Sequence, residues 1–207
     1  SEPARMINRI RVSLKHLIVE CGSSTNYRDS LGRPFNSDPP PLLDGLRIRP
    51  LQVRNLCLVF SSAYRYDTPA DAVLSRDFFL SFPAVKQFQL CHSKTITANI
   101  QERISEVWGE NLLSLKLEAG YDEGCFPPAH GLNFAKLNRL SIVDCSAEQQ
   151  ATQHVVLAAA PTLRELEVST NTHDRFNVQT AIQACKHLQA LSVYAPIYTL
   201  LLPQCLG

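Results

Sequence analysis

The segment Leu163-Arg-Glu-Leu-Glu-Val168 decides the fold, because its pattern of apolar positions returns throughout the chain. The pattern is Leu-x-x-Leu-x-Leu, with other apolar residues admitted, and it occurs seven times at intervals of 25 to 39 residues. Repetition at such a spacing is typical of solenoids, in which each unit buries its apolar side only against its neighbours. The copies start at Leu14, Val53, Val85, Leu112, Leu137, Leu163 and Leu188.

The residues around this segment indicate what one unit contains. Ser146 and Gln149 have the spacing of a capping box, an apolar helical stretch follows them, and Pro161 ends it. Leu166 and Val168 then alternate with charged residues, as in a short strand with one buried side. We therefore expect an α/β fold: a curved solenoid with parallel strands on the concave face and helices on the convex face.

The unit resembles the leucine-rich repeat of ribonuclease-inhibitor-like proteins, and most closely the cysteine-containing repeat of F-box proteins. That repeat continues with Cys or Asn after the pattern, and Cys145 and Asn171 occupy this position. Other copies depart from it, with Gly, Ser, Gly and Pro at positions 22, 61, 120 and 196. The resemblance implies one leucine-rich-repeat domain of about seven repeats over residues 1–207. It also implies a non-catalytic protein-interaction scaffold, such as the substrate-recognition repeats of an F-box-like ubiquitin-ligase adaptor.

The composition narrows the classes of partner. The 207 residues carry a net charge of +1, which argues against a dedicated nucleic-acid binder. This total conceals an asymmetry, because residues 1–103 sum to +5 and residues 104–207 to −4. No apolar run approaches the roughly 18 residues that a membrane-spanning helix needs. We expect protein partners, and no nucleic acid, membrane or small-molecule substrate.

The cysteines indicate a reducing compartment and give little support for a catalytic role. Their number is seven, and no C-x-x-C pair occurs, so we expect buried thiols in a cytoplasmic or nuclear protein. Cys57 and Cys91 lie on adjacent repeats and could approach each other. Cys91 and His92 are neighbours in a strand, so their side chains should point to opposite faces, which prevents a nucleophile–base pair.

No phosphate-binding glycine motif occurs either. We expect no cofactor, no metal and no catalytic residue. One enzymatic alternative stays open, a ligase with a cysteine nucleophile, which would require a thiol of low pKa.

Two insertions and the chain ends interrupt the pattern. Residues 22–42 are rich in Pro and Gly and residues 61–68 contain Tyr64 and Tyr66, so both predict loops projecting from the solenoid. Thr68, followed by Pro69, predicts a helix that begins there and continues through Leu80. At both ends, residues with helical spacing lack a strand of their own, and we expect a piece of a longer protein; the alternative is that these end helices are themselves caps.

The positions between the apolar ones should form the concave surface. Neighbouring strands lie about 4.8 Å apart, so equivalent residues should form continuous rows, basic at first and more acidic later. A mixed polar surface of this kind suits a protein or peptide partner, and the alternative function is a structural subunit within a larger assembly. The candidate partner-binding residues are Lys15, Arg54, Lys86, Gln89, Lys116, Arg139, Glu165, Glu167, Tyr64 and Tyr66.

Overall fold

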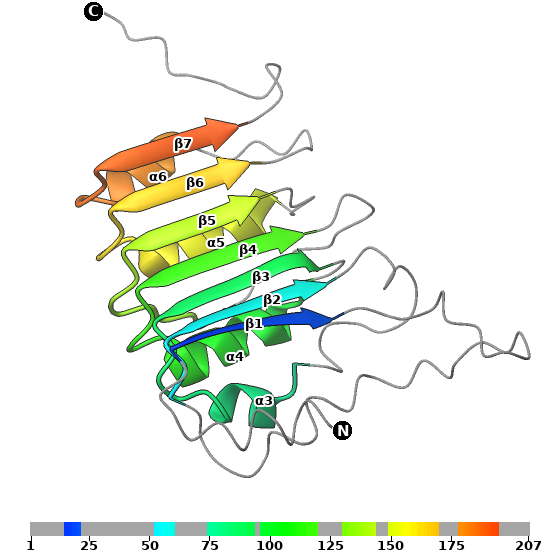
Figure 1. The fold of residues 1–207 in the computed structure, drawn as a ribbon. Helices are drawn as coiled ribbons and strands as arrows, with labels where there is room; N and C mark the ends of the chain where they lie inside the picture. The colour runs from blue at the N-terminus through cyan, green and yellow to red at the C-terminus, as the bar shows by residue number, and fades with distance from the viewer. Residues whose placement is uncertain are drawn as a thin grey trace, which may run out of the picture.

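One parallel sheet organises the protein. The computed structural model describes residues 15–21, 52–60, 74–93, 96–119, 130–143, 149–169 and 178–194. They contain a seven-stranded sheet whose strand order follows the chain from β1 to β7 (Figure 1). Each copy of the repeated pattern supplies one strand, which confirms the predicted parallel sheet. The strands are β1 (His16–Cys21), β2 (Asn55–Phe60), β3 (Gln87–Ser93), β4 (Ser114–Ala119), β5 (Arg139–Val143), β6 (Glu165–Ser169) and β7 (Ala190–Tyr194).

The register of the sheet matches equivalent positions of the pattern. Leu56 of β2, for example, lies opposite Leu17 of β1 on one side and Phe88 of β3 on the other. Side chains alternate along a strand, so two apolar positions of each copy point to the same face. That face is buried in β2 to β6, and those apolar side chains are at most 2% exposed there. In β7 the two corresponding residues, Leu191 and Val193, are only partly buried.

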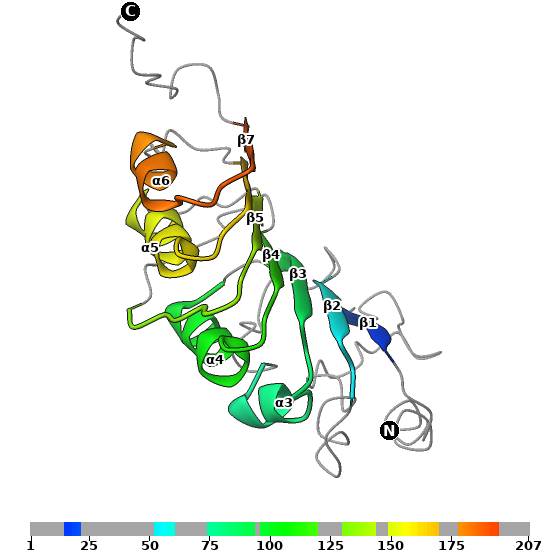
Figure 2. The same ribbon diagram turned by 90° about the vertical axis from the view of Figure 1, so that its left-hand side faces the viewer.

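The helices all cover one face of the sheet. They are α3 (Arg76–Leu80), α4 (Ala98–Trp108), α5 (Gln149–Ala159) and α6 (Val178–Ala184). Each precedes the strand of its own unit, so the chain alternates between the two layers. Figure 2 shows the four helices on one side of the sheet, and it shows the sheet bending so that its uncovered face is the concave one.

The helix ends follow local capping, and one of the predicted starts is wrong. Helix α3 begins at Arg76, because Ser75 is extended and its hydroxyl accepts the backbone N–H of Phe78 at 3.3 Å. The helix that carries Phe78 therefore does not begin at Thr68. At the other end of the molecule, α5 stops two residues before Pro161, as predicted.

An aromatic cluster fills the space between the first two helices and the sheet. The ring centroid of Trp108 lies 4.9 Å from that of Phe79 on α3 and 4.9 Å from that of Phe88 on β3. All three side chains are fully buried. The indole N–H of Trp108 donates a hydrogen bond of 2.8 Å to the carbonyl of Phe82. This bond satisfies the one polar atom of the buried side chain.

Residues 130–138, which lead into β5, form a non-helical segment on the helix side of the sheet. Phe134 fills the core there, and the backbone N–H of Asn133 donates to the Ser105 hydroxyl at 2.7 Å. This segment thus packs directly against α4. The predicted loops at 22–42 and 61–68 and both chain ends lie outside the described residues.

Candidate functional site

The uncovered concave face of the sheet carries polar residues in continuous rows. The central row runs across all seven strands, each residue opposite the next, and it confirms the register expected from the sequence. Because the backbone bonds of the sheet fix the row, its side chains are displayed from a rigid base. The row consists of Ile18, Cys57, Gln89, Lys116, Ser141, Glu167 and Ser192.

A second row lies along the rim where the strands begin. The carbonyl of Lys15 accepts the N–H groups of Arg54 and Asn55 at 3.0 and 2.9 Å, and that of Arg54 accepts Lys86 at 2.8 Å. The same pattern of backbone hydrogen bonds continues along this row to Gln189. The structure therefore places three predicted residues, Lys15, Arg54 and Lys86, on neighbouring strands, all exposed. We call these three residues the basic strip.

The charges in the middle of the concave face are paired. Lys116 Nζ lies 2.8 Å from Glu118 Oε2 within β4, and the hydrogen bond between them raises the pKa of Lys116. Ser141 donates its hydroxyl proton to Glu167 Oε2 at 2.7 Å across β5 and β6. One row away, Arg139 Nε lies 3.0 Å from Glu165 Oε2. The predicted polar residues of β4 to β6 therefore contact each other or an immediate neighbour.

Two thiols lie beside this network. Cys57 and Cys91 are free and share a hydrogen bond, as expected for adjacent repeats. Burial raises the pKa of the Cys91 thiol to about 11, and the neighbouring Cys57 and Glu118 add to the shift. Burial likewise raises the pKa of Cys57. A thiol is nucleophilic as the thiolate, so this environment suppresses the reactivity of both.

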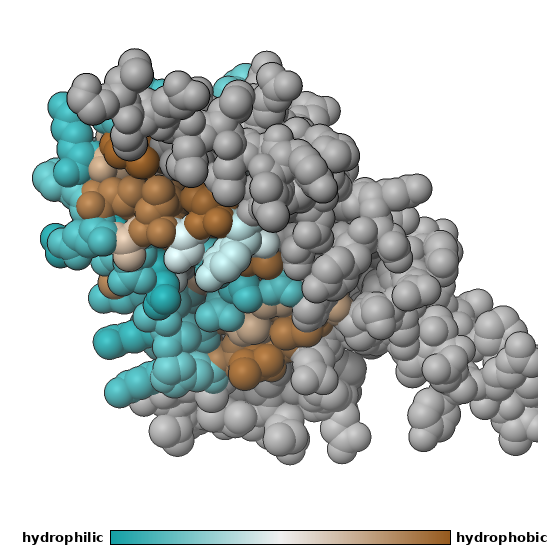
Figure 3. Space-filling model, turned by 90° about the horizontal axis from the view of Figure 1, so that it is seen from above, coloured by the Kyte–Doolittle hydropathy of each residue, from teal (hydrophilic) through white to brown (hydrophobic). Residues whose placement is uncertain are grey.

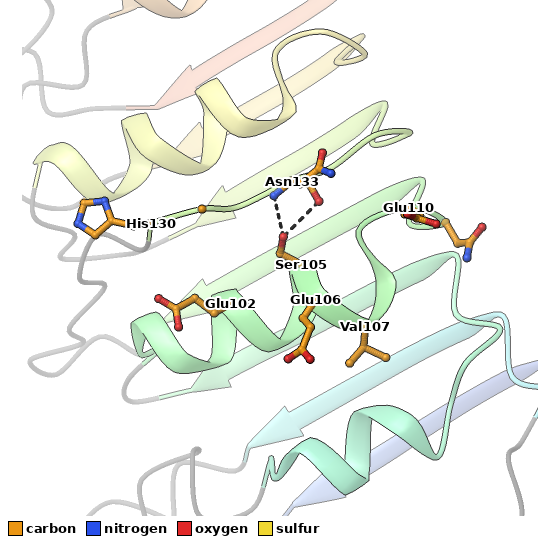
Figure 4. Close-up of a pocket in the computed structure, with 9 residues that line it drawn as sticks. Glu102, Ser105, Glu106, Val107, Glu110, His130 and Asn133 are labelled. Carbon is orange, nitrogen blue, oxygen red and sulfur yellow. Dashed lines mark hydrogen bonds between the residues drawn. The ribbon is translucent and has the colours of Figure 1, made fainter.

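The convex side has a hollow that the sequence did not predict. It measures about 530 Å³ and lies between the outer side of α4 and the non-helical residues 130–133 (Figure 4). Glu102, Glu106 and Glu110 line it at helical spacing. Glu106 is held by Arg76 at 2.6 Å. The sequence offers one signal for this segment, Gly131, whose φ of 67° few other residues adopt.

The β7 end of the sheet exposes apolar side chains. Tyr194 is 62% exposed and Ile182 of α6 is 51% exposed, while Leu191 and Val193 are partly buried. Figure 3 looks onto this end of the molecule and shows hydrophobic surface among hydrophilic side chains. No eighth strand covers β7 within the described residues.

The remaining candidates have simple outcomes. Gln89 is exposed on β3 between Cys57 and Lys116, whereas Tyr64 and Tyr66 lie outside the described residues. In the described part of the chain no three His, Cys, Asp or Glu side chains are grouped so that they could hold a metal ion. The described helices include none long and apolar enough to cross a membrane.

Comparison with known proteins identifies no relative of this chain. No protein-family model, curated protein or solved structure matches the chain.

Proposed function

We propose that the chain is a leucine-rich-repeat solenoid and acts as a non-catalytic scaffold that binds a protein partner on its concave face. The observation that carries this proposal is the central row, which crosses seven strands on a face that the described helices do not cover and is polar from Gln89 to Ser192. A rigid, concave polar surface of this width suits a folded or extended protein partner. The raised pKa values of Cys57 and Cys91 count against a cysteine-nucleophile ligase.

The resemblance to cysteine-containing repeats supports a narrower role. We propose that these repeats recognise the substrate of an F-box-like ubiquitin-ligase adaptor in the cytoplasm or nucleus. Co-purification of an F-box-binding adaptor subunit with the full-length protein is the expected result. If no such subunit co-purifies under conditions that retain other partners, the scaffold function stands and the ubiquitin-ligase role fails.

Affinity capture with matched surface variants tests the scaffold. Gln89→Glu with Ser192→Glu adds two negative charges to exposed positions of the central row. Gln183→Glu with Asn99→Glu adds the same charge to exposed positions of α6 and α4. Proteins captured by the unmodified chain should be lost with the first pair and kept with the second. Equal capture by both pairs would contradict binding on the concave face.

The β7 end favours a second candidate, a structural subunit packed within a larger assembly. Exposed apolar side chains at the edge of a sheet mark surfaces that neighbouring proteins cover. Replacing Ile182 and Tyr194 by Lys should then abolish co-purification with the assembly and improve the solubility of the isolated chain. Leu157→Lys with Leu80→Lys, at positions 41% and 45% exposed, serves as the control. If the β7-end pair leaves co-purification intact, this candidate fails.

A further inference from the structure

Unlike Lys116, Arg139 and Glu167, the three residues of the basic strip have no internal partner among the described residues. Lys15, Arg54 and Lys86 form no ion pair or side-chain hydrogen bond with the residues that the structure describes. Farther along the sheet, by contrast, Glu165 and Glu167 are engaged by Arg139 and Ser141. The described acidic groups of β6 are therefore already engaged within the chain. The strip is left with positive charge to offer to another molecule.

The strip is also built on a fixed base. Carbonyl-to-amide hydrogen bonds of 2.8 to 3.0 Å join the backbones of Lys15, Arg54 and Lys86 into one ladder. Strands in a sheet are about 4.8 Å apart, so the three residues span about 10 Å. The arginine lies in the middle, and its planar guanidinium can hold a carboxylate by two parallel hydrogen bonds.

We propose that the basic strip binds an extended acidic segment of the protein partner, and this inference rests on the scaffold function proposed above. Side chains on one side of an extended segment recur about every 6.8 Å, so two acidic residues separated by one residue fit within the length of the strip. The next position in the rim row is Leu113, which is half-buried. An apolar residue two positions after the second acidic one would meet it. The partner motif is thus acidic-x-acidic-x-apolar.

Other polyanions fit the strip less well. Single-stranded nucleic acids gain much of their affinity by stacking bases on aromatic side chains, and the described strands β1 to β4 present no exposed aromatic residue beside the strip. Anionic membranes are recognised by clusters of about four to eight basic residues, more than the strip contains. A protein carboxylate cluster matches both the charge and the small size of the strip.

Binding of labelled octaglutamate at low ionic strength tests the inference. Arg54→Gln with Lys86→Gln removes two charges from the strip. Lys136→Gln with Lys186→Gln removes two charges from exposed turns that lead into β5 and β7, so the net charge is the same in both variants. We expect fluorescence anisotropy to show an affinity loss of about tenfold for the first pair and less than twofold for the second. Equal losses, or no binding by the unmodified chain, would overturn the inference.

Carbodiimide cross-linking locates the contact. The reagent joins a carboxylate to a nearby lysine, and peptide mapping should find octaglutamate on Lys15 and Lys86 in preference to Lys136 and Lys186. The peptide Ser-Glu-Ser-Glu-Ser-Leu-Ser should compete better than the same peptide with Gln for Glu. Cross-links confined to the control lysines would contradict the proposed site.

Two further probes separate this inference from its rivals and from the scaffold function. Tighter binding of oligodeoxythymidine or phosphatidylserine vesicles than of octaglutamate would replace the acidic segment by a nucleic acid or a membrane. If the peptide does not bind but Gln89→Glu with Ser192→Glu abolishes partner capture, the scaffold function stands and the acidic segment fails. If Arg54→Gln with Lys86→Gln weakens both peptide binding and partner capture, both proposals gain support.

Discussion

The two halves of the helix layer solve the same packing problem with different side chains. Between α3, α4 and the sheet the core is aromatic, with Phe79, Phe88 and Trp108 in mutual contact. Between α5, α6 and the sheet, small residues such as Ala159 and Ala181 are fully buried instead. The sheet below is continuous, because every neighbouring pair of strands is hydrogen-bonded, with one shift of register between β3 and β4 after Leu90.

This difference shows how variable helices can be attached to a regular sheet. Backbone hydrogen bonds fix the strand spacing, so the volume under each helix has to be filled by side chains. Helix α4 of the first half and helix α5 of the second both have eleven residues, so helix length does not account for the difference. The buried side chains do, since Trp108 of α4 is fully buried in one half and Ala159 of α5 in the other. Each half should therefore respond to the opposite change in side-chain volume.

Removing the largest buried side chain should have the greatest effect. Trp108→Ala should lower the free energy of unfolding by about 3–5 kcal/mol, because it leaves a cavity between two rings and removes the donor to the Phe82 carbonyl. Urea denaturation monitored by circular dichroism measures the loss. Trp108→Phe keeps an aromatic ring without the N–H and should cost less. A change below about 1 kcal/mol for the alanine variant would show that the cluster is not the anchor of this half.

Adding volume should disturb the alanine half. Ala159→Leu places three further carbons at a position with no exposed surface and should cost about 1–3 kcal/mol through strain. Leu157→Ala, on the same helix but 41% exposed, should change the free energy of unfolding much less. A stabilised Ala159→Leu protein would mean that a void lies under α5, and the contrast between the two halves would disappear.

Alkaline pH should weaken the first half through its thiols. The pKa of Cys91 is about 11 in the folded protein against an ordinary value of 9.0, so the unfolded chain loses this proton first. The contribution of this pKa difference to the free energy of unfolding is fully present below pH 9 and is lost as the pH rises toward 11. In a fully shielded site, a pKa difference of two would contribute roughly 2.7 kcal/mol to the free energy of unfolding. Contact with solvent screens the Cys91 thiol and reduces this contribution to about 1 kcal/mol.

Denaturant midpoints between pH 8 and 11 check this expectation. Cys91→Ala should show a shallower decline than the unmodified protein over that range. The remaining slope should come from other groups, including Cys57 and Lys116, whose pKa values are also raised in the folded state. Identical slopes for the two proteins would contradict the burial of the Cys91 thiol.

The strands were predictable from the sequence, but the helix layer that covers them was predictable only in part. Alternation in Leu163-Arg-Glu-Leu-Glu-Val168 depends on a period of two that any half-buried strand shares, and the register then follows from equivalent positions. The start of α3 was wrong because Ser75 and Thr68 are both good N-caps, and local sequence does not decide between them. The aromatic cluster joins Phe79 to Trp108 across 29 positions, and only the packed helices bring the two rings together.

The candidate site shows the same division. The rows that contain Lys15, Arg54 and Lys86 follow directly from the repeat. Which charges pair does not follow from it, because Lys116 contacts Glu118 on its own strand while Arg139 contacts Glu165 on the next. The hollow beside α4 depends on how the non-helical residues 130–133 lie against that helix, which no period in the sequence indicates.

Capping of α4 should contribute less than either packing effect. The Thr97 hydroxyl accepts the N–H of Ile100 at 3.3 Å, and Thr97→Ala should lower the free energy of unfolding by about 1 kcal/mol. Thr97→Ser keeps the acceptor and should lose only a small part of this. If both variants lose the same amount, the methyl group of Thr97 and not its hydroxyl stabilises the helix end.

A surface ion pair should have the smallest effect, which limits the contrast to the core. Arg139 and Glu165 contact each other at 3.0 Å but are 66% and 52% exposed. A double-mutant cycle with Arg139→Gln and Glu165→Gln should give a coupling energy of about 0.2–1 kcal/mol. Screening should reduce it further in 1 M salt, where the Debye length is about 3 Å. A larger, salt-independent coupling would mean that this pair helps to hold β5 against β6, and that the two halves differ at their surface as well as beneath their helices.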